Sequence, residues 1–181
     1  GTVRISGAKN AASKMMIASL LTDERMTLHN FPAIGETDIT GELCGVLGSS
    51  ISLSGDTLSM HTPTIVSHKV PSLSRRNRVP ILALGPLLAR CGKAEIPILG
   101  GDRIGPRPVN LHFDALAAMG ASIRAHDAGY EASAPEGLHG AKIVFPFPSV
   151  GATENTILAA VLARGKTIIQ NAAIEPEIVD L

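Results

Sequence analysis

Apolar residues recur in three similar segments of the chain, residues 19–30, 86–97 and 160–171. In each segment the helical spacing of apolar residues ends in a polar or glycine-containing turn, and a short apolar run typical of a strand follows. The copies are separated by about seventy residues, which indicates an internal repeat. The pattern therefore predicts three related units, each containing a helix that leads into a strand.

A second pair of similar segments, residues 43–52 and 116–124, predicts helices that end at Gly48 and Gly120. Each is followed by a predicted hairpin, over residues 50–60 with a turn at 55–56 and over residues 122–132 with a turn at 127–129. The repeating unit is thus helix, strand, helix, hairpin. We place the units at about residues 6–66, 67–140 and 141–181.

The third unit stops at residues 175–180, where a second helix begins on a proline, so we expect a truncated chain. Units of this length are too long for a solenoid. Alternating helices and strands indicate an α/β domain with pseudo-threefold symmetry, in which we expect helices inside and sheets outward.

Composition narrows the class of protein. The formal net charge is zero and aromatic residues make up 3% with no Trp, so neither nucleic acid nor a membrane surface is an expected partner. The longest apolar run, residues 79–89, contains two prolines and is too short to span a bilayer. The two cysteines, Cys44 and Cys91, have no metal-ligand spacing and indicate reduced, buried thiols. With no export signal visible, we expect a cytoplasmic protein without a metal site.

Polar residues interrupt the apolar pattern where the first helix of each unit is expected, at residues 6–10, 74–78 and 149–155. A helix start offers free backbone N–H groups and a partial positive charge, which suit phosphate or carboxylate. Lys9 and Arg78 would strengthen such a site. N-capping by Ser6, Ser74 and Ser149 explains any single segment. Three equivalent starts favour an anion-binding cluster.

Residues 99–112 contain three glycines and two prolines, which predicts a loop with defined turns. The loop carries one carboxyl group, Asp102, and two guanidinium groups, Arg103 and Arg107. An exposed ion pair is one interpretation of these charges. The conformational restriction of the loop favours a functional role instead.

Five motifs now point to a known family: residues 5–12, 83–90, 100–109, 149–155 and 171–180. In their order and spacing the chain resembles the enolpyruvyl transferases, and among them the family that uses UDP-N-acetylglucosamine. The resemblance implies two domains of three units, each an inside-out α/β barrel, with substrates between them. This chain would be most of one domain, with the second domain absent. An enzyme for shikimate phosphate would share the fold but is not expected to carry the motifs at 149 and 171.

The resemblance also implies residue roles. Lys9 would bind phosphoenolpyruvate, Asn10 would contact the sugar nucleotide, and Asp102 would donate a proton, at a position where most of the family has cysteine. Arg78 and Arg107 would hold phosphate and carboxylate groups. Lys9 and Arg107 would be catalytic residues together with Asp102. Phe147 departs from relatives that have a lysine there. The uridine-diphosphate site would be lined by Arg107, Pro108, Val109, Asn110, Leu111, Ser149, Val150 and Gly151.

The implied reaction transfers the enolpyruvyl group from phosphoenolpyruvate to the 3-hydroxyl of UDP-N-acetylglucosamine and releases phosphate, as the first committed step of peptidoglycan synthesis. It needs no cofactor, but it needs a proton donor, cations and a base, which we expect in the absent domain. Two alternatives stay open. One is an enolpyruvyl transferase that uses another nucleotide, and the other is a truncated binding domain without catalytic activity. The chain alone is expected to be inactive.

Overall fold

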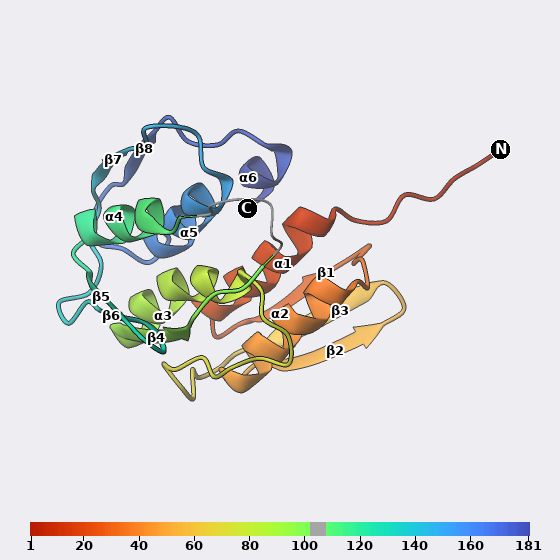
Figure 1. Ribbon diagram of the computed structural model, residues 1–181. Coiled ribbons are helices and arrows are strands. Elements are labelled where there is room, and N and C mark those ends of the chain that lie inside the picture. The colour runs from red at the N-terminus through yellow and green to blue at the C-terminus, as the bar shows by residue number, and fades with distance from the viewer. Residues whose placement is uncertain (102–107) are drawn as a thin grey trace.

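A computed structural model describes residues 1–101 and 108–181. The helices and strands follow the predicted order twice (Figure 1). The first series is α1 (Lys9–Ala18), η1 (Ser19–Leu21), β1 (Arg25–Leu28), α2 (Gly35–Val46), β2 (Ser50–Ser54) and β3 (Thr57–His61). The second is η2 (Val79–Ala83), α3 (Leu84–Cys91), β4 (Lys93–Pro97), α4 (Asn110–Ala118), β5 (Ser122–His126) and β6 (Gly129–Ser133). The third series is partial and consists of β7 (Lys142–Val144), α5 (Val150–Ala160), β8 (Ile168–Gln170) and α6 (Pro176–Asp180).

The first two series build sheets of the same topology. Their strand orders are β1-β3-β2 and β4-β6-β5, and all pairs in both sheets are antiparallel. Both predicted hairpins are confirmed, because β2 pairs with β3 and β5 with β6. The strands β7 and β8 form a separate parallel pair. The α/β class is therefore confirmed, while the residue limits of the units stay a prediction.

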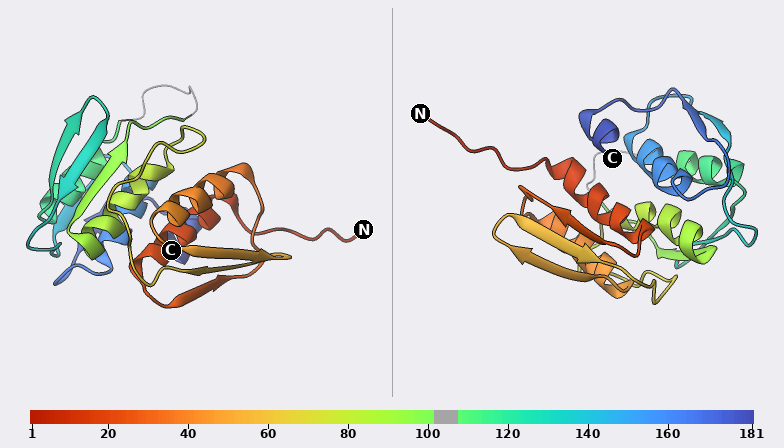
Figure 2. Two further views of the ribbon diagram at one scale, coloured as in Figure 1. Left: turned by 90° about the horizontal axis from the view of Figure 1, so that it is seen from below. Right: turned by 180° about the vertical axis from the view of Figure 1, so that it is seen from behind.

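The helices lie between the two antiparallel sheets, which face outward (Figure 2). At the centre, α3 contacts α5, and α1 packs against α2 and η2. The side chains of Leu84, Leu87 and Leu88 on α3 are completely buried, as are Ile17 of α1 and Leu43 of α2. One hydrophobic core thus connects the helices of all three series.

Turn residues explain why the sequence segments look alike. Gly48 and Gly120 have positive φ angles of 113° and 97° immediately after the C-caps of α2 and α4, which confirms the predicted glycine helix ends. Asn30 and Asn171, the last residues of two aligned segments, have φ angles of 54° and 57°. Asparagine tolerates this left-handed conformation better than most residues. The repeat in the sequence is therefore also a repeat of backbone conformation.

N-capping by serine, the alternative explanation of the three helix starts, holds for only one of them. The N-cap of α1 is Ala8, and no side chain caps that helix. Ser74 lies before the second series and bonds to Glu42 through its amide and its hydroxyl, at 2.8 and 2.6 Å. Helix formation there starts only at Val79, in a 3₁₀ turn with a proline near its start. Ser149 alone of the three caps a helix as expected.

Candidate active site

The first turns of α4 and α5 lie side by side. Ser149 is the N-cap of α5, and its Oγ accepts a hydrogen bond from the Ala152 amide at 3.4 Å. A Cβ atom on Gly151 would lie 3.3 Å from Cε1 of His112 on α4, so the two helix starts are in contact. Val109 is the N-cap of α4. Segments 108–111 and 149–151, predicted to line one nucleotide site, are thus neighbours.

Asn155 joins these helix starts to α3 and η2 from inside the protein. Its side chain is completely buried, and its Oδ1 accepts a hydrogen bond from the Gly85 amide at 3.2 Å. Its Nδ2 donates to the carbonyl of Ile81 and lies 3.2 Å from Nδ1 of His112. Since an amide nitrogen can only donate, Nδ1 of His112 is the acceptor. The buried amide therefore holds three elements in one arrangement.

His112 is a neutral imidazole in this arrangement. Burial and, to a smaller extent, the positive charge of Arg78 together lower its pKa to about 4. Arg78 is the N-cap of η2 and is half-buried. The structure thus places Arg78 close enough to the start of α4 for its charge to act on His112. Arg78, predicted to hold an anion, belongs to the same group of helix starts.

The start of α1 carries Lys9 and Asn10, the two other predicted residues that the structure describes. The side chain of Lys9 is 64% exposed, and its Nζ lies 3.6 Å from a carboxylate oxygen of Glu36 on α2. Nδ2 of Asn10 donates a hydrogen bond of 3.1 Å to Glu177 on α6. Because α6 also packs against α5, these contacts connect α1 with the third series.

A second lysine lies behind Lys9. Nζ of Lys14 is 3.9 Å from Glu36 and 3.9 Å from Glu154 on α5. Glu36 also accepts a 2.8 Å hydrogen bond from the hydroxyl of the buried Ser13. Burial raises the pKa of Glu154 to about 7, against the opposing effect of Lys14. Two lysines and two carboxyl groups from three helices thus form one series of ion pairs, from the exposed Lys9 to the buried Glu154.

Several predictions fall outside these contacts. Asp102, Arg103 and Arg107 lie outside the described residues, so their roles stay predictions. Cys44 is buried, and burial raises its pKa to about 12, whereas Cys91 is only partly buried, which corrects the expectation of two buried thiols. Phe147 is 54% exposed.

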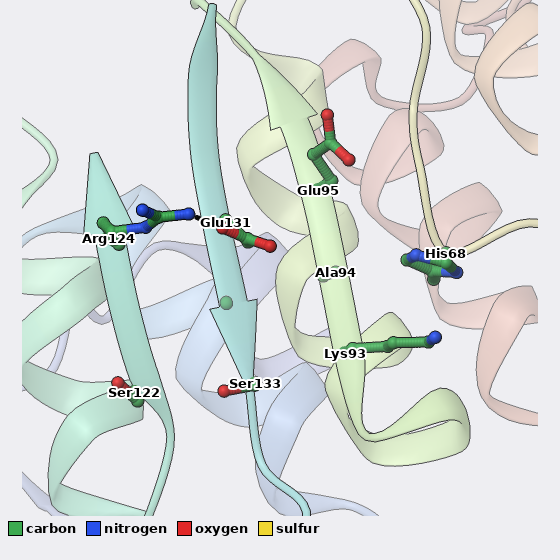
Figure 3. A pocket seen from close by; sticks show the side chains of 9 residues that line it. His68, Lys93, Ala94, Glu95, Ser122, Arg124, Glu131 and Ser133 are labelled. Carbon is green, nitrogen blue, oxygen red and sulfur yellow. Dashed lines mark hydrogen bonds and ion pairs between the residues drawn. The ribbon is translucent and has the colours of Figure 1, made fainter. Parts of the chain in front are cut away.

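A hollow of about 360 Å³ lies elsewhere, on the outer face of the sheet β4-β6-β5 (Figure 3). Its lining includes Lys93, Glu95, Arg124 and Glu131, and the last two form an exposed ion pair. None of the predicted site residues lines it. Among residues 1–101 and 108–181, no group of three His, Cys, Asp or Glu side chains is placed to hold a metal ion. No helix in that part is long and apolar enough to cross a membrane.

The sequence did not single out Lys14 or Glu36, and it did not predict the buried contacts of His112, Glu154 and Asn155. The last three residues lie inside segments 99–112 and 149–155, which the sequence analysis had selected, but nothing in the sequence indicated which residues they contact. A lone Lys or Glu in a helix is normally read as solvated. Only the packing of α1, α2 and α5 brings Lys14, Glu36 and Glu154 together.

Comparison with known proteins identifies the family and the fold to which this chain belongs. The family model of EPSP synthase (3-phosphoshikimate 1-carboxyvinyltransferase) matches residues 1–181. Among solved structures, the enolpyruvyl transferase NikO from Streptomyces tendae superposes with a TM-score of 0.84 at 20% identity, covering 99% of this chain and 42% of that one. EPSP synthase from Acinetobacter baumannii gives 0.74 at 17% identity, with the same coverage. The chain belongs to the EPSP synthase family and has the enolpyruvyl transferase fold.

Similarity within the family is higher to one kind of transferase. UDP-N-acetylglucosamine 1-carboxyvinyltransferase of Chlamydia pneumoniae is 50% identical over the whole chain, and so is the protein of that name from Caulobacter vibrioides. The chain spans 40% and 43% of the length of these two relatives. The resemblance noted in the sequence is thus confirmed for this portion of their length.

Proposed function

We propose that the whole protein containing this chain transfers the enolpyruvyl group of phosphoenolpyruvate to the 3-hydroxyl of UDP-N-acetylglucosamine, with release of phosphate. The observation that carries the proposal is the 50% identity over the entire chain to transferases of that name. In this role the protein would act in the cytoplasm at the first committed step of peptidoglycan synthesis, and thereby in cell wall growth and division.

We infer that residues 1–181 form most of one of two domains, with the substrates between them. The adjacent starts of α4 and α5 would bind the uridine diphosphate, because free N–H groups at helix starts favour phosphate. The half-buried Arg78 beside them would add a cation. Lys9, on the exposed start of α1, would bind phosphoenolpyruvate. Arg107 would contribute a further cation.

Asp102 would donate the proton that C3 of phosphoenolpyruvate receives, while the sugar hydroxyl adds to C2. An ordinary aspartic acid, with a pKa of about 3.9, is ionised at neutral pH. The donor therefore needs burial or a bound anion that neutralises nearby arginines, either of which favours the protonated form. The base that accepts the hydroxyl proton would come from the other domain. Elimination of phosphate from the tetrahedral adduct then completes the transfer.

The test is phosphate release from phosphoenolpyruvate by the whole protein, measured with and without UDP-N-acetylglucosamine. We expect release only when both substrates are present. Lys9→Ala should lower kcat/KM by an amount equivalent to about 2–5 kcal/mol, the usual loss for a charged contact with substrate. Lys166→Ala, which removes an exposed lysine, serves as the matched control. Full activity of Lys9→Ala would contradict the assignment of Lys9, and no release at all would contradict the proposed reaction.

A further inference from the structure

Glu154 is a buried carboxyl group that no predicted role uses. It lies on the second turn of α5, and its side chain is 3% exposed. Its Oε1 has no hydrogen-bond partner among the described residues. The ion pair with Lys14, at 3.9 Å, is too long for a hydrogen bond. A carboxylate held in this way is poorly compensated for the loss of water.

Glu154 is the inner end of a chain of alternating charges that reaches the surface. Glu154 faces Lys14, Lys14 faces Glu36, and Glu36 faces Lys9. Side-chain exposure rises along this chain from 3% to 16%, 29% and 64%. The outer end is the lysine proposed to bind phosphoenolpyruvate. Glu36 is shared by the two lysines, and Lys14 is shared by the two carboxylates. A change in the charge near Lys9 therefore alters how strongly Lys14 stabilises the Glu154 carboxylate.

The other charged groups around Glu154 oppose its ionisation. Glu36 from α2 and Glu177 and Glu175 from α6 and its N-cap each raise the pKa of Glu154, in the same direction as burial. Lys14 from α1 is the group that lowers it. On the remaining neighbours of α5, His112 of α4 is neutral, Arg78 of η2 acts on His112, and Arg90 of α3 donates to backbone carbonyls of Leu20 and Thr22.

We propose that Glu154 is a positioning residue of the phosphoenolpyruvate site and takes up a proton from solvent when the anion binds beside Lys9. The inference rests on the proposed function of Lys9. An anion at Lys9 competes with Glu36 for that lysine, and Glu36 then pairs more strongly with Lys14. Lys14 in turn stabilises the Glu154 carboxylate less, so Glu154 binds a proton. The four groups thereby change from zero net charge to +1, which favours the bound anion.

The sign of the pH response follows directly. A protein that takes up a proton on binding a ligand loses affinity as the pH rises. Because the pKa of Glu154 without the anion is about 7, affinity should be constant below that value and fall above it. The fall continues, by at most tenfold per pH unit, until the higher pKa of the anion-bound state is passed. At pH 7 about half a proton should be taken up for each anion bound.

The experiment is titration calorimetry of phosphoenolpyruvate into the whole protein at pH 7, in two buffers of different ionisation enthalpy. The difference in heat between the buffers gives the number of protons taken up. The same titrations are made on Glu154→Gln, which keeps the shape but cannot titrate, and on Glu136→Gln, which removes an exposed carboxyl group from the loop after β6. Any titration of the ligand itself is common to all three proteins and cancels in the comparison.

We expect proton uptake in the unmodified protein and in Glu136→Gln, and its loss in Glu154→Gln together with a flatter dependence of Kd on pH. Lys14→Gln is a second test, because without this lysine Glu154 should already be protonated and uptake should again be lost. Equal uptake in the unmodified protein and Glu154→Gln would overturn the inference while leaving the proposed function intact. If phosphoenolpyruvate did not bind the unmodified protein, the role of Lys9 would fall and the inference with it.

Discussion

Two buried groups, Glu154 and His112, should give the stability of this chain opposite dependences on pH. Burial raises the pKa of Glu154 from 4.5 to about 7 and lowers that of His112 from 6.5 to about 4. As pH rises from 4.5 to 7 the unfolded state loses the proton of Glu154 before the folded state does, which destabilises the fold. As pH falls from 6.5 to 4, His112 takes up its proton in the unfolded state before it does so in the folded state, which also destabilises the fold.

Each of these pKa changes, from 4.5 to about 7 and from 6.5 to about 4, corresponds to about 3 kcal/mol. Between about pH 4.5 and 6.5 the two effects have opposite slopes, so they nearly cancel in the unmodified chain. Glu154→Gln removes one of them. Relative to the unmodified chain, the variant should gain about 3 kcal/mol in free energy of unfolding between pH 4.5 and pH 7. His112→Asn, which keeps an acceptor for Asn155, should show the opposite change, gaining about 3 kcal/mol between pH 6.5 and pH 4.

The assay is equilibrium unfolding in urea at a series of pH values, followed by far-ultraviolet circular dichroism because the chain has no Trp. Differences between variant and unmodified chain are compared, so groups that titrate equally in both do not contribute. Glu136→Gln is the control, since its exposed carboxyl should give a small difference at every pH. A difference for Glu154→Gln that stayed constant from pH 4.5 to 8 would show that Glu154 ionises normally in the fold.

Four further predictions concern packing and chemistry. Gly85→Ala should cost about 1–3 kcal/mol of stability, because the new Cβ would lie 2.9 Å from the Ala159 amide nitrogen, as a urea titration would show. Asn155→Leu should lower the melting temperature more than any surface change, since it leaves buried partners on three elements unpaired. In the whole protein, Asp102→Cys should become sensitive to alkylation by the epoxide fosfomycin, because a thiolate opens an epoxide ring faster than a carboxylate does. Asp102→Asn should abolish solvent deuterium incorporation at C3, and full turnover of that variant would remove Asp102 from the mechanism.

The elements that the sequence predicted well are those set by local chemistry. Both hairpins turn where glycine or a short polar run interrupts apolar alternation, and α2 and α4 each end at a glycine with positive φ. Ser149 was found as an N-cap because its own motif contains both the cap and the following helix. These features need only a few consecutive residues, so tertiary packing does not change them.

The serine N-cap alternative failed at Ser74, and the buried charges were missed, because both depend on packing. Ser74 was a candidate cap at an expected helix start, as Ser149 was, yet Glu42 of α2 accepts hydrogen bonds from both its amide and its hydroxyl. Lys14 and Glu154 both resemble solvated helix residues, and their pairing depends on how α1 packs near α5. The sequence therefore indicated candidate helix starts, whereas the pairing of Lys14 with Glu36 and Glu154 behind them depends on the packed structure.

The positions of the buried polar side chains support a functional reading of these charges. Asn155, His112 and Glu154 are all at most 4% exposed, and all three lie on α4 or α5 close to the starts of those helices. A fold optimised only for stability would fill such positions with apolar side chains, since buried polar groups cost free energy unless fully bonded. Both polar atoms of the Asn155 amide form hydrogen bonds that fix the helix starts. In contrast, Oε1 of Glu154 has no hydrogen-bond partner among the described residues, and Glu154 shares Lys14 with Glu36. A destabilising group retained beside a proposed anion site is expected where function depends on it. Glu154→Gln should therefore make the fold more stable above pH 7 and at the same time remove the coupling between proton and anion.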